Sequence, residues 1–140
     1  MTMIDKRSFK DWFEGSKVVD GQGNPLVLYH GTQRDFIHFR TPAWFTADKS
    51  MAEFFAIAPN DDPQPGDSPR VVPVYLALRN PLHTDDWDVT EDKAFDPEWR
   101  KQQLLAGHDG VIFTSDEGEV EYIAFHPDQI RRVVLETQAA

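Results

Sequence analysis

A carboxylate stands at the start of a short apolar segment near the C-terminal end of the sequence. The segment is VEYIAF, residues 120–125, and Glu121 is its second residue. Because side chains alternate along a strand, Glu121, Ile123 and Phe125 are predicted to share one face, which places the acid beside apolar neighbours. A carboxylate at the mouth of a cleft can hydrogen-bond a sugar hydroxyl and stabilise positive charge developing on carbon. The alternative is an edge-strand glutamate that points at water.

A histidine ends a second apolar run, LVLYHGT, residues 26–32. His30 is followed at once by Gly31, and a glycine lets the backbone approach a flat ligand closely, with its N–H and C=O groups turned toward it. Thr32 adds a hydroxyl group. The alternative is a histidine that caps a turn at the end of a strand.

Several other chemistries are disfavoured by residue types and spacing. The chain has no cysteine, so we expect no disulfide, no thiol nucleophile and no thiolate metal site. The five histidines form no HxxxH or HxH pair, so no metal site is expected. No serine stands in a G-x-S-x-G elbow, and GQGNP lacks the spacing of a dinucleotide fingerprint.

Length and composition predict one domain spanning residues 1–140, since 140 residues with 40% hydrophobic and 12% aromatic content can build one core. The formal net charge of −10 disfavours non-specific binding to phosphate backbones. No apolar run approaches the ~18 to 20 residues needed to span a bilayer, so no membrane association is expected. The start, MTMIDKRSFKDWF, lacks the apolar core of a secretory signal, so we expect a cytoplasmic protein.

The elements that must position these residues form an α+β pattern with more strand than helix. Residues 8–14 predict a short helix, begun by Ser8. The runs KVV and LVLY flank the turn formers DGQGNP, which predicts a hairpin over residues 17–29. A strand is expected at residues 43–46, followed by a helix capped by Asp48.

The second half continues in the same way. Residues 59–70 are rich in proline and predict a surface loop. Residues 83–96 are acidic and are expected to be irregular, whereas Asp96, Pro97 and Gly107 bound a helix. Asp109 and Gly110 are expected to shape a turn. Strands are predicted at residues 71–78, 110–113, 120–125 and 131–136.

Three motifs resemble the ADP-ribosyltransferase superfamily in their order and spacing. They are YHGT, WFTADKSMAEFFA and VEYIAF. The pattern is similar to the diphtheria-toxin-like and poly(ADP-ribose)-polymerase-like branch, whose signature is His, then Tyr, then Glu. The longer strings SKVVDGQGNPLVLYHGT, GHDGVIF and EYIAFHPDQI resemble the small bacterial and phage ADP-ribosyltransferase domains of polyvalent proteins. The resemblance covers about residues 9–131.

This resemblance implies a split β-sandwich with a central NAD⁺ cleft and a few flanking helices. By it, His30 would bond the adenosine-side ribose, and the Gly31 backbone would hold the nicotinamide carboxamide. Glu121 would bond the 2′-hydroxyl of the nicotinamide ribose and stabilise an oxocarbenium-like transition state. A strand would hold that acid rigidly beside the sugar. Glu121 and His30 are therefore the expected catalytic residues. The expected NAD⁺-binding residues are Tyr29, His30, Gly31, Thr32, Phe45, Thr46 and Phe55, and Phe36 is a further candidate for the cleft lining.

The sequence departs from the family pattern in the middle motif. The pattern has an alanine, two further residues and then a tyrosine, whereas the segment that begins with Ala52 and ends with Phe54-Phe55 places Phe55 at the tyrosine. Stacking on nicotinamide needs only a ring face, and the missing hydroxyl removes at most one hydrogen bond, worth ~0.5 to 1.5 kcal/mol. Core packing is the alternative for Phe54 and Phe55, and we expect it to hold for at least one of them.

The function implied is a mono-ADP-ribosyltransferase that moves ADP-ribose from NAD⁺ to a macromolecular acceptor and releases nicotinamide. Glu119 and Glu121 repeat the E-x-E spacing often found in enzymes that modify arginine, so Glu119 is a candidate for positioning the acceptor, with a solvated role in an acidic turn as the alternative. The acceptor, a protein or a nucleic acid, is left open, as are an antitoxin or immunity partner and delivery into a target cell as a toxin-like effector. Two further hypotheses are an NAD⁺ glycohydrolase and a non-catalytic NAD- or ADP-ribose-binding module on the same fold.

Overall fold

The computed structural model of the chain describes residues 7–34, 38–58 and 62–133. One sheet has three antiparallel strands in the order β1-β3-β7, with bounds Leu28–Thr32, Arg70–Leu76 and Ile130–Arg132. The central strand, β3, alternates buried and half-buried residues along RVVPVYL, as expected for a strand with one face in a core.

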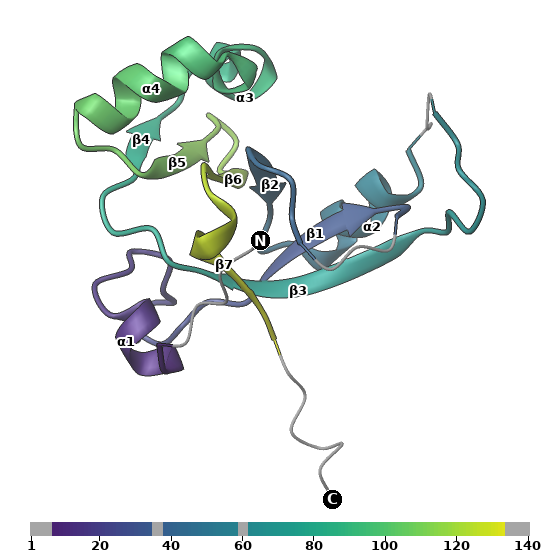
Figure 1. Cartoon of the computed structure of the whole chain (residues 1–140), viewed down its shortest axis with the longest axis horizontal. Helices are drawn as coiled ribbons and strands as arrows, with labels where there is room; N and C mark the ends of the chain where they lie inside the picture. The colour runs from purple at the N-terminus through teal and green to yellow at the C-terminus, as the bar shows by residue number, and fades with distance from the viewer. Residues whose placement is uncertain (1–6, 35–37, 59–61, 134–140) are drawn as a thin grey trace, which may run out of the picture.

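The second sheet has four strands in the order β2-β6-β5-β4 (Figure 1). Their bounds are Ala43–Phe45, Val120–Ala124, Gly110–Thr114 and Leu82–Thr84. β5 and β6 form an antiparallel hairpin, and β4 pairs with β5 in parallel. An antiparallel bridge, Tyr29 with Thr46, joins the two sheets. The N–H of Tyr29 donates to the Thr46 carbonyl at 2.7 Å, and the N–H of Thr46 donates back at 3.0 Å.

Two hydrophobic clusters hold these layers together. The first lies between the sheets, where Val74 and Leu76 of β3 pack with Tyr122 and Ala124 of β6. The second covers the other face of the four-stranded sheet and consists of Val89, Ala94, Val111, Phe113, Ile123 and Phe125. Because β6 contributes alternate residues to the two clusters, its predicted alternation is confirmed, and Glu121 falls on the second face with Ile123.

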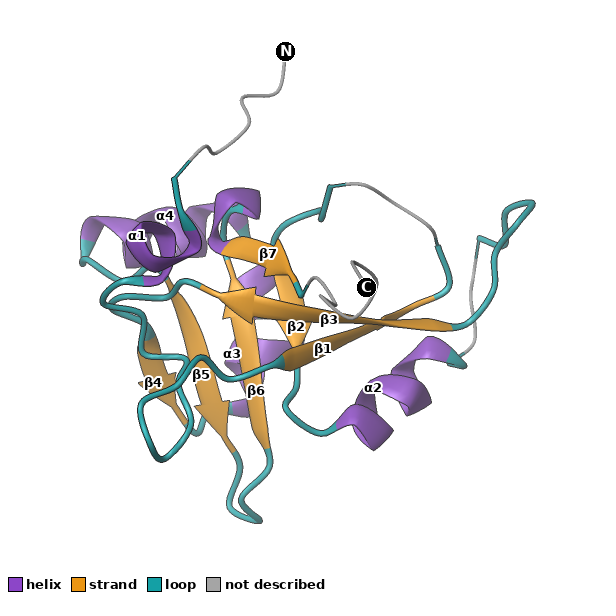
Figure 2. Ribbon diagram, turned by 90° about the horizontal axis from the view of Figure 1, so that it is seen from below, coloured by secondary structure: helices purple, strands orange, loops and turns teal. Residues whose placement is uncertain are grey.

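The helical segments of the described residues are α1 (Phe9–Phe13), α2 (Lys49–Ala56), α3 (Trp87–Glu91), η1 (Lys93–Phe95), α4 (Pro97–Leu105) and the short η2 turn (Pro127–Gln129). α2 lies beside β1, while α3 and α4 lie at the end of the molecule that holds β4 and β5 (Figures 1 and 2). None of the described helices is long and apolar enough to cross a membrane. Helices and mixed sheets together confirm the α+β class.

The helix starts agree with the predicted caps. Asp48 accepts hydrogen bonds from the backbone N–H groups of Ser50 and Met51 at 2.9 and 3.3 Å, and Asp96 accepts one from Glu98 at 3.0 Å. Both satisfy donors that a first helical turn leaves unpaired. The predicted turn role of Asp109 is also confirmed, since its carboxylate accepts from the N–H groups of Arg79 and Asn80.

One prediction for local structure is borne out only around its turn, and another is wrong. The hairpin expected over residues 17–29 is held by an antiparallel bridge between Val19 and Pro25 and by backbone hydrogen bonds from Asp20 to Asn24 and from Leu26 to Val18, but from Leu28 onward the second arm pairs with β3. Residues 83–96 are not irregular: Asp86 caps α3 at 3.0 Å, and Val89 and Ala94 bury this segment against the four-stranded sheet. The last strand begins at Ile130, and residues 134–136 of the predicted strand lie outside the described residues.

Candidate active site

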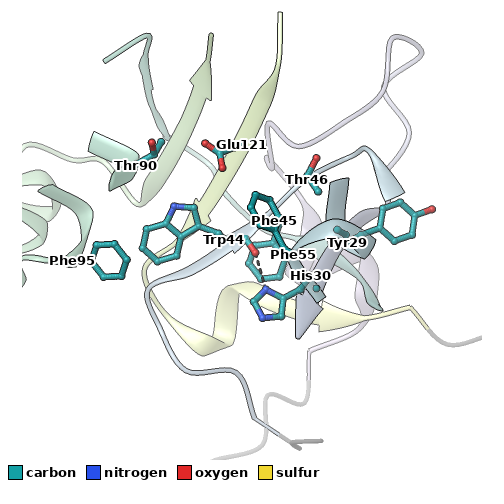
Figure 3. A pocket seen from close by; sticks show the side chains of 11 residues that line it. Tyr29, His30, Trp44, Phe45, Thr46, Phe55, Thr90, Phe95 and Glu121 are labelled. Carbon is teal, nitrogen blue, oxygen red and sulfur yellow. Dashed lines mark hydrogen bonds between the residues drawn. The ribbon is translucent and has the colours of Figure 1, made fainter. Parts of the chain in front are cut away.

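A cleft of about 270 Å³ opens where β1, β2 and α2 meet α3, η1 and β6 (Figure 3). Its walls are mainly aromatic, with one carboxylate and one imidazole among them. The lining residues are Tyr29, His30, Gly31, Trp44, Phe45, Thr46, Ala52, Phe55, Thr90, Phe95 and Glu121. Seven of the residues predicted from the sequence are thus brought together: Tyr29, His30, Gly31, Phe45, Thr46, Phe55 and Glu121.

Glu121 is half-buried on β6, directly opposite Phe113 of β5. Within the described part of the chain its carboxylate has no hydrogen bond and no ion pair. Burial is the largest cause that raises the pKa of Glu121, and the nearby carboxylates of Glu119 and Glu91 raise it further. An acid that is desolvated and repelled in this way, without a compensating cation, is typical of a functional site.

His30 lies across the cleft from Glu121 (Figure 3). Its Nδ1 is 2.8 Å from the carbonyl oxygen of Trp44. Because a carbonyl can only accept, Nδ1 carries the proton, and in the neutral ring Nε2 is then an acceptor. The ring also contacts Phe39 and Phe45, with centroids 5.3 and 5.4 Å away. Burial lowers the pKa of His30, and the bond to the Trp44 carbonyl only partly opposes that shift, so the imidazole is neutral at pH 7.

The backbone of Gly31 points into the cleft because of the strand pairing. Residues two apart in an antiparallel strand aim their N–H and C=O groups at the same side. Those of Tyr29 face away from β3 and bond Thr46, so those of Gly31 also face away from β3. Gly31 lies beyond the bridge, where the cleft opens. This edge of β1 therefore presents one donor and one acceptor side by side.

The packing of α2 against β1 also requires a glycine at position 31. A Cβ built at this position would lie 2.0 Å from the carbonyl oxygen of Ala52 and 2.9 Å from the backbone N of Ala56. Both alanines are buried and belong to α2. The helix therefore approaches β1 through its alanine face, and only a glycine leaves room for it.

This approach turns the phenylalanines of α2 away from the core. Phe55 is 48% exposed at the cleft and Phe54 is 64% exposed. The expectation that at least one of them packs in the core is wrong, because Ala52 and Ala56 occupy the buried face of the helix. Phe39, by contrast, is buried in the first cluster.

Two predicted site residues lie in neighbouring cavities. Thr32 lines a cavity of about 450 Å³ that His30 also lines, together with Arg34 and Arg40. Glu119 lines a different cavity, of about 440 Å³, that adjoins Glu121. Phe36 lies outside the described residues.

The sequence reasoning missed three residues that complete the walls. Trp44 and Phe95 stack with ring centroids 4.7 Å apart and an interplanar angle of 28°, and Thr90 is buried beside them. Trp44 pairs with Ile123 across β2 and β6, so it shares the face that carries Glu121. That alternation could have identified Trp44, whereas Thr90 and Phe95 belong to the segment predicted to be irregular.

No group of three or more His, Asp or Glu side chains in the described ranges is placed to hold a metal ion. The cleft instead offers ring faces, a backbone donor and acceptor, a neutral imidazole and a carboxylate. Residues 20–139 match the protein family described as ADP-ribosyltransferase in polyvalent proteins. No curated protein matches the chain.

Proposed function

The chain belongs to the family of ADP-ribosyltransferases in polyvalent proteins, and we propose that it is a mono-ADP-ribosyltransferase that moves one ADP-ribose unit from NAD⁺ to a macromolecule. ADP-ribosyl transfer and NAD⁺ use follow from the family. We further propose that the residues form a single domain. The observation that carries the proposal is the half-buried carboxylate of Glu121, which faces an aromatic cleft and has no cation beside it in the described structure.

For the nicotinamide half of NAD⁺, we place the ring against the exposed face of Phe55. Stacking needs only a ring face, and Trp44 and Phe95 offer a second aromatic wall. The carboxamide presents an NH₂ donor group and a carbonyl acceptor side by side, which match the C=O and N–H of Gly31. Tyr29, Phe45 and Thr46 line the remaining wall.

For the adenosine half, we propose that Nε2 of His30 accepts a hydrogen bond from a ribose hydroxyl. The diphosphate, which joins the two riboses, then lies where the cleft meets the cavity lined by His30, Thr32, Arg34 and Arg40. The guanidinium of Arg40 suits this dianionic group, since a guanidinium bonds phosphate oxygens strongly. That of Arg34 is already paired with Asp62 and Asp67, at 3.7 Å in each case. The chain as a whole carries a net charge of −10, so this local positive charge gives NAD⁺ one favoured direction.

In the proposed reaction, the bond between C1′ of the ribose and the nicotinamide nitrogen breaks, and its electron pair leaves with neutral nicotinamide. Positive charge develops on the ribose as the bond lengthens. The carboxylate of Glu121 accepts a hydrogen bond from the 2′-hydroxyl and stabilises that charge in a partly desolvated site, where electrostatic effects are strong. The acceptor then forms the new bond to C1′ and loses a proton.

The test is to incubate the protein with NAD⁺ and follow nicotinamide release, with and without cell lysate, for wild type and Glu121→Gln. The amide keeps the shape of the side chain but removes its charge, so turnover should fall by ~10²-fold or more while NAD⁺ binding, measured by calorimetry, is retained. Glu98→Gln is the control, because Glu98 is an exposed residue of α4 that does not line the cleft. Turnover of Glu121→Gln within a few-fold of wild type would remove Glu121 from the mechanism.

A second candidate function is NAD⁺ hydrolysis, in which water takes the place of the acceptor. The cavity that adjoins Glu121 favours it, since its opening admits water to the carboxylate. Nicotinamide release without lysate would indicate the hydrolase, and lysate-dependent labelling would indicate the transferase. A protein that binds NAD⁺ and shows neither activity would be a binding module.

A further inference from the structure

A second cavity, which we call the outer chamber, adjoins the cleft on the side of Glu121. Its volume is about 440 Å³, and it shares Thr46, Phe55 and Glu121 with the cleft. A group in the outer chamber therefore lies beside the same carboxylate that faces the cleft. If NAD⁺ occupies the cleft as proposed above, its nicotinamide ribose lies beside Glu121. A second reactant in the outer chamber then lies close to C1′ of that ribose.

The floor of the outer chamber is apolar and partly aromatic. Phe55 and Trp87 line it and are 48% and 49% exposed, and Met51 lies with them. Exposed aromatic faces of this kind bind flat groups and cations, because the face of a ring carries partial negative charge. Trp87 stands on α3 and packs against Phe113 with ring centroids 4.6 Å apart, so its indole is held in place.

The rim of the outer chamber carries only negative charge. Asp48, Glu117 and Glu119 line it together with Glu121, and neither lysine nor arginine is among the lining residues. Asp48 is occupied as the cap of α2. In the described structure the side chains of Glu117 and Glu119 make no hydrogen bond or ion pair, so their carboxylates are available to a ligand.

The turn that holds Glu117 and Glu119 is ordered by its own hydrogen bonds. The backbone N–H of Glu119 donates to Oγ of Ser115 at 3.0 Å, and the N–H of Ser115 donates to the Glu119 carbonyl at 2.8 Å. Gly118 takes φ of +86°, the left-handed conformation that suits a glycine in this turn. The two carboxylates are thus carried on a fixed turn beside the reactive centre.

The two ends of the site differ in charge. The cavity that His30 also lines carries Arg40, together with Arg34 in ion pairs with Asp62 and Asp67, whereas the charged lining residues of the outer chamber are all carboxylates. A phosphate group is repelled from the outer chamber, so neither the diphosphate of NAD⁺ nor a nucleic-acid backbone fits there. A cationic head on an apolar stem fits both the floor and the rim.

We propose that the outer chamber is the acceptor site and that its acceptor is a basic side chain of a protein, a guanidinium or an ammonium group. The stem lies on Phe55 and Trp87, and the head is held by Glu117 and Glu119. A planar guanidinium suits both contacts, since it stacks on rings and bonds carboxylates in pairs. This inference rests on the proposed transferase function and adds the chemical class of the acceptor.

The step balances without an oxidant or reductant. The acceptor nitrogen loses one proton to a carboxylate of the rim and then to water, and its lone pair forms the N–C1′ bond. The C1′–nicotinamide bond breaks, and its electron pair stays with nicotinamide. The products are neutral nicotinamide, one released proton and an ADP-ribosylated side chain.

The experiment supplies the full chain with tagged NAD⁺ and one of four acceptors: an arginine-rich peptide, a lysine-rich peptide, a neutral peptide of serine and glutamine, and single-stranded RNA. Label transfer and nicotinamide release are measured in the same reaction. We expect one or both basic peptides to be labelled at least ~10-fold faster than the neutral peptide and the RNA, as two exposed charge contacts can provide. Labelling should weaken as ionic strength rises from ~0.05 to ~0.5 M, because the contacts are exposed.

The variant is the double change Glu117→Gln and Glu119→Gln, and Glu98→Gln is the matched control, which removes the same type of charge outside the chamber. In the double variant the ratio of peptide labelling to nicotinamide release should fall ~10-fold, whereas the control should keep the wild-type ratio. Three results would overturn this inference alone, provided that nicotinamide is released. They are equal labelling of basic and neutral peptides, preferred labelling of RNA, and labelling by wild type that does not change with salt. A protein that releases no nicotinamide under any condition overturns the proposed function and this inference with it.

Discussion

Replacing Gly31 by alanine tests how β1, α2 and the cleft depend on one another. The new Cβ would lie 2.0 Å from the carbonyl oxygen of Ala52, whereas ordinary contact begins near 3.4 Å. All three nearest atoms belong to the backbone of α2, so no side chain can rotate out of the way. The helix must therefore move by more than 1 Å, or the strand must bend.

The expected loss of stability for Gly31→Ala is ~3 kcal/mol, at the upper end of overpacking because backbone meets backbone. For a domain of this size that corresponds to a melting temperature ~10 °C lower by calorimetry. Because α2 also carries Phe55 into the cleft, a displacement of about 1 Å should reduce turnover of NAD⁺ by ~10²-fold.

Gly21→Ala is the matched control. No atom lies within 4 Å of a Cβ built at Gly21, and its φ is not in the left-handed region. This change should leave the melting temperature within ~2 °C of wild type, since it only reduces the freedom of the unfolded chain. If Gly31→Ala melts as high as Gly21→Ala, the close packing of α2 on β1 is wrong. A Gly31→Ala variant that is stable but no longer binds NAD⁺ would show that Gly31 is needed for ligand binding and not for the packing of α2.

Phe55→Tyr should keep its melting temperature and match or exceed the wild-type rate, because its ring is 48% exposed and the added hydroxyl can bond water or ligand; a clear fall in melting temperature by calorimetry would contradict that placement. Gln129→Leu should lose ~3 kcal/mol in urea unfolding, since its buried amide accepts from the N–H groups of Phe125 and His126 and donates to the Asp109 carbonyl; unchanged unfolding would refute this role. Turnover should fall as pH decreases through the raised pKa of Glu121, so the acidic limb of the pH–rate profile should have its midpoint above the ordinary glutamate pKa. A midpoint at or below the ordinary glutamate pKa would argue against a role for the carboxylate. The same raised pKa means that folding favours protonated Glu121, so the ionised form destabilises the fold above that pKa. Glu121→Gln should accordingly melt higher than wild type near pH 8 and equally below the unfolded pKa, which calorimetry at the two pH values will decide.

Much of the site follows from strand alternation and glycine placement, which are local properties of the sequence. Alternation along residues 120–125 places Glu121 on the face with Ile123, and the structure has it there. The Asp48 and Asp96 caps are equally local, since each carboxylate bonds N–H groups within three residues. Such features need no knowledge of the tertiary fold.

The missed features depend on contacts between distant segments. β1 pairs with β3, about 40 residues away in sequence, so the nearby turn at residues 20–24 could not reveal its partner. Phe54 and Phe55 look like core residues, but the close approach of α2 to Gly31 gives the buried face to alanines. Thr90 and Phe95 line the cleft because residues 83–96, which the sequence predicts to be irregular, pack against the four-stranded sheet through Val89 and Ala94.

The bridge between Tyr29 and Thr46 has a consequence for how the site can diversify. It consists of two hydrogen bonds between main-chain atoms, 2.7 and 3.0 Å long, so it does not depend on which side chains stand at these two positions. The spacing of the cleft walls and the chemistry of the cleft lining can therefore change independently during evolution. Substitutions at residue 29 should alter which ligand is preferred while the amides of residues 29 and 46 keep the same slow hydrogen exchange, whereas Thr46 is buried and its hydroxyl accepts the N–H of Asp48 at 3.0 Å at the start of α2. A scaffold of this kind can acquire new acceptors by single substitutions without rebuilding its sheets.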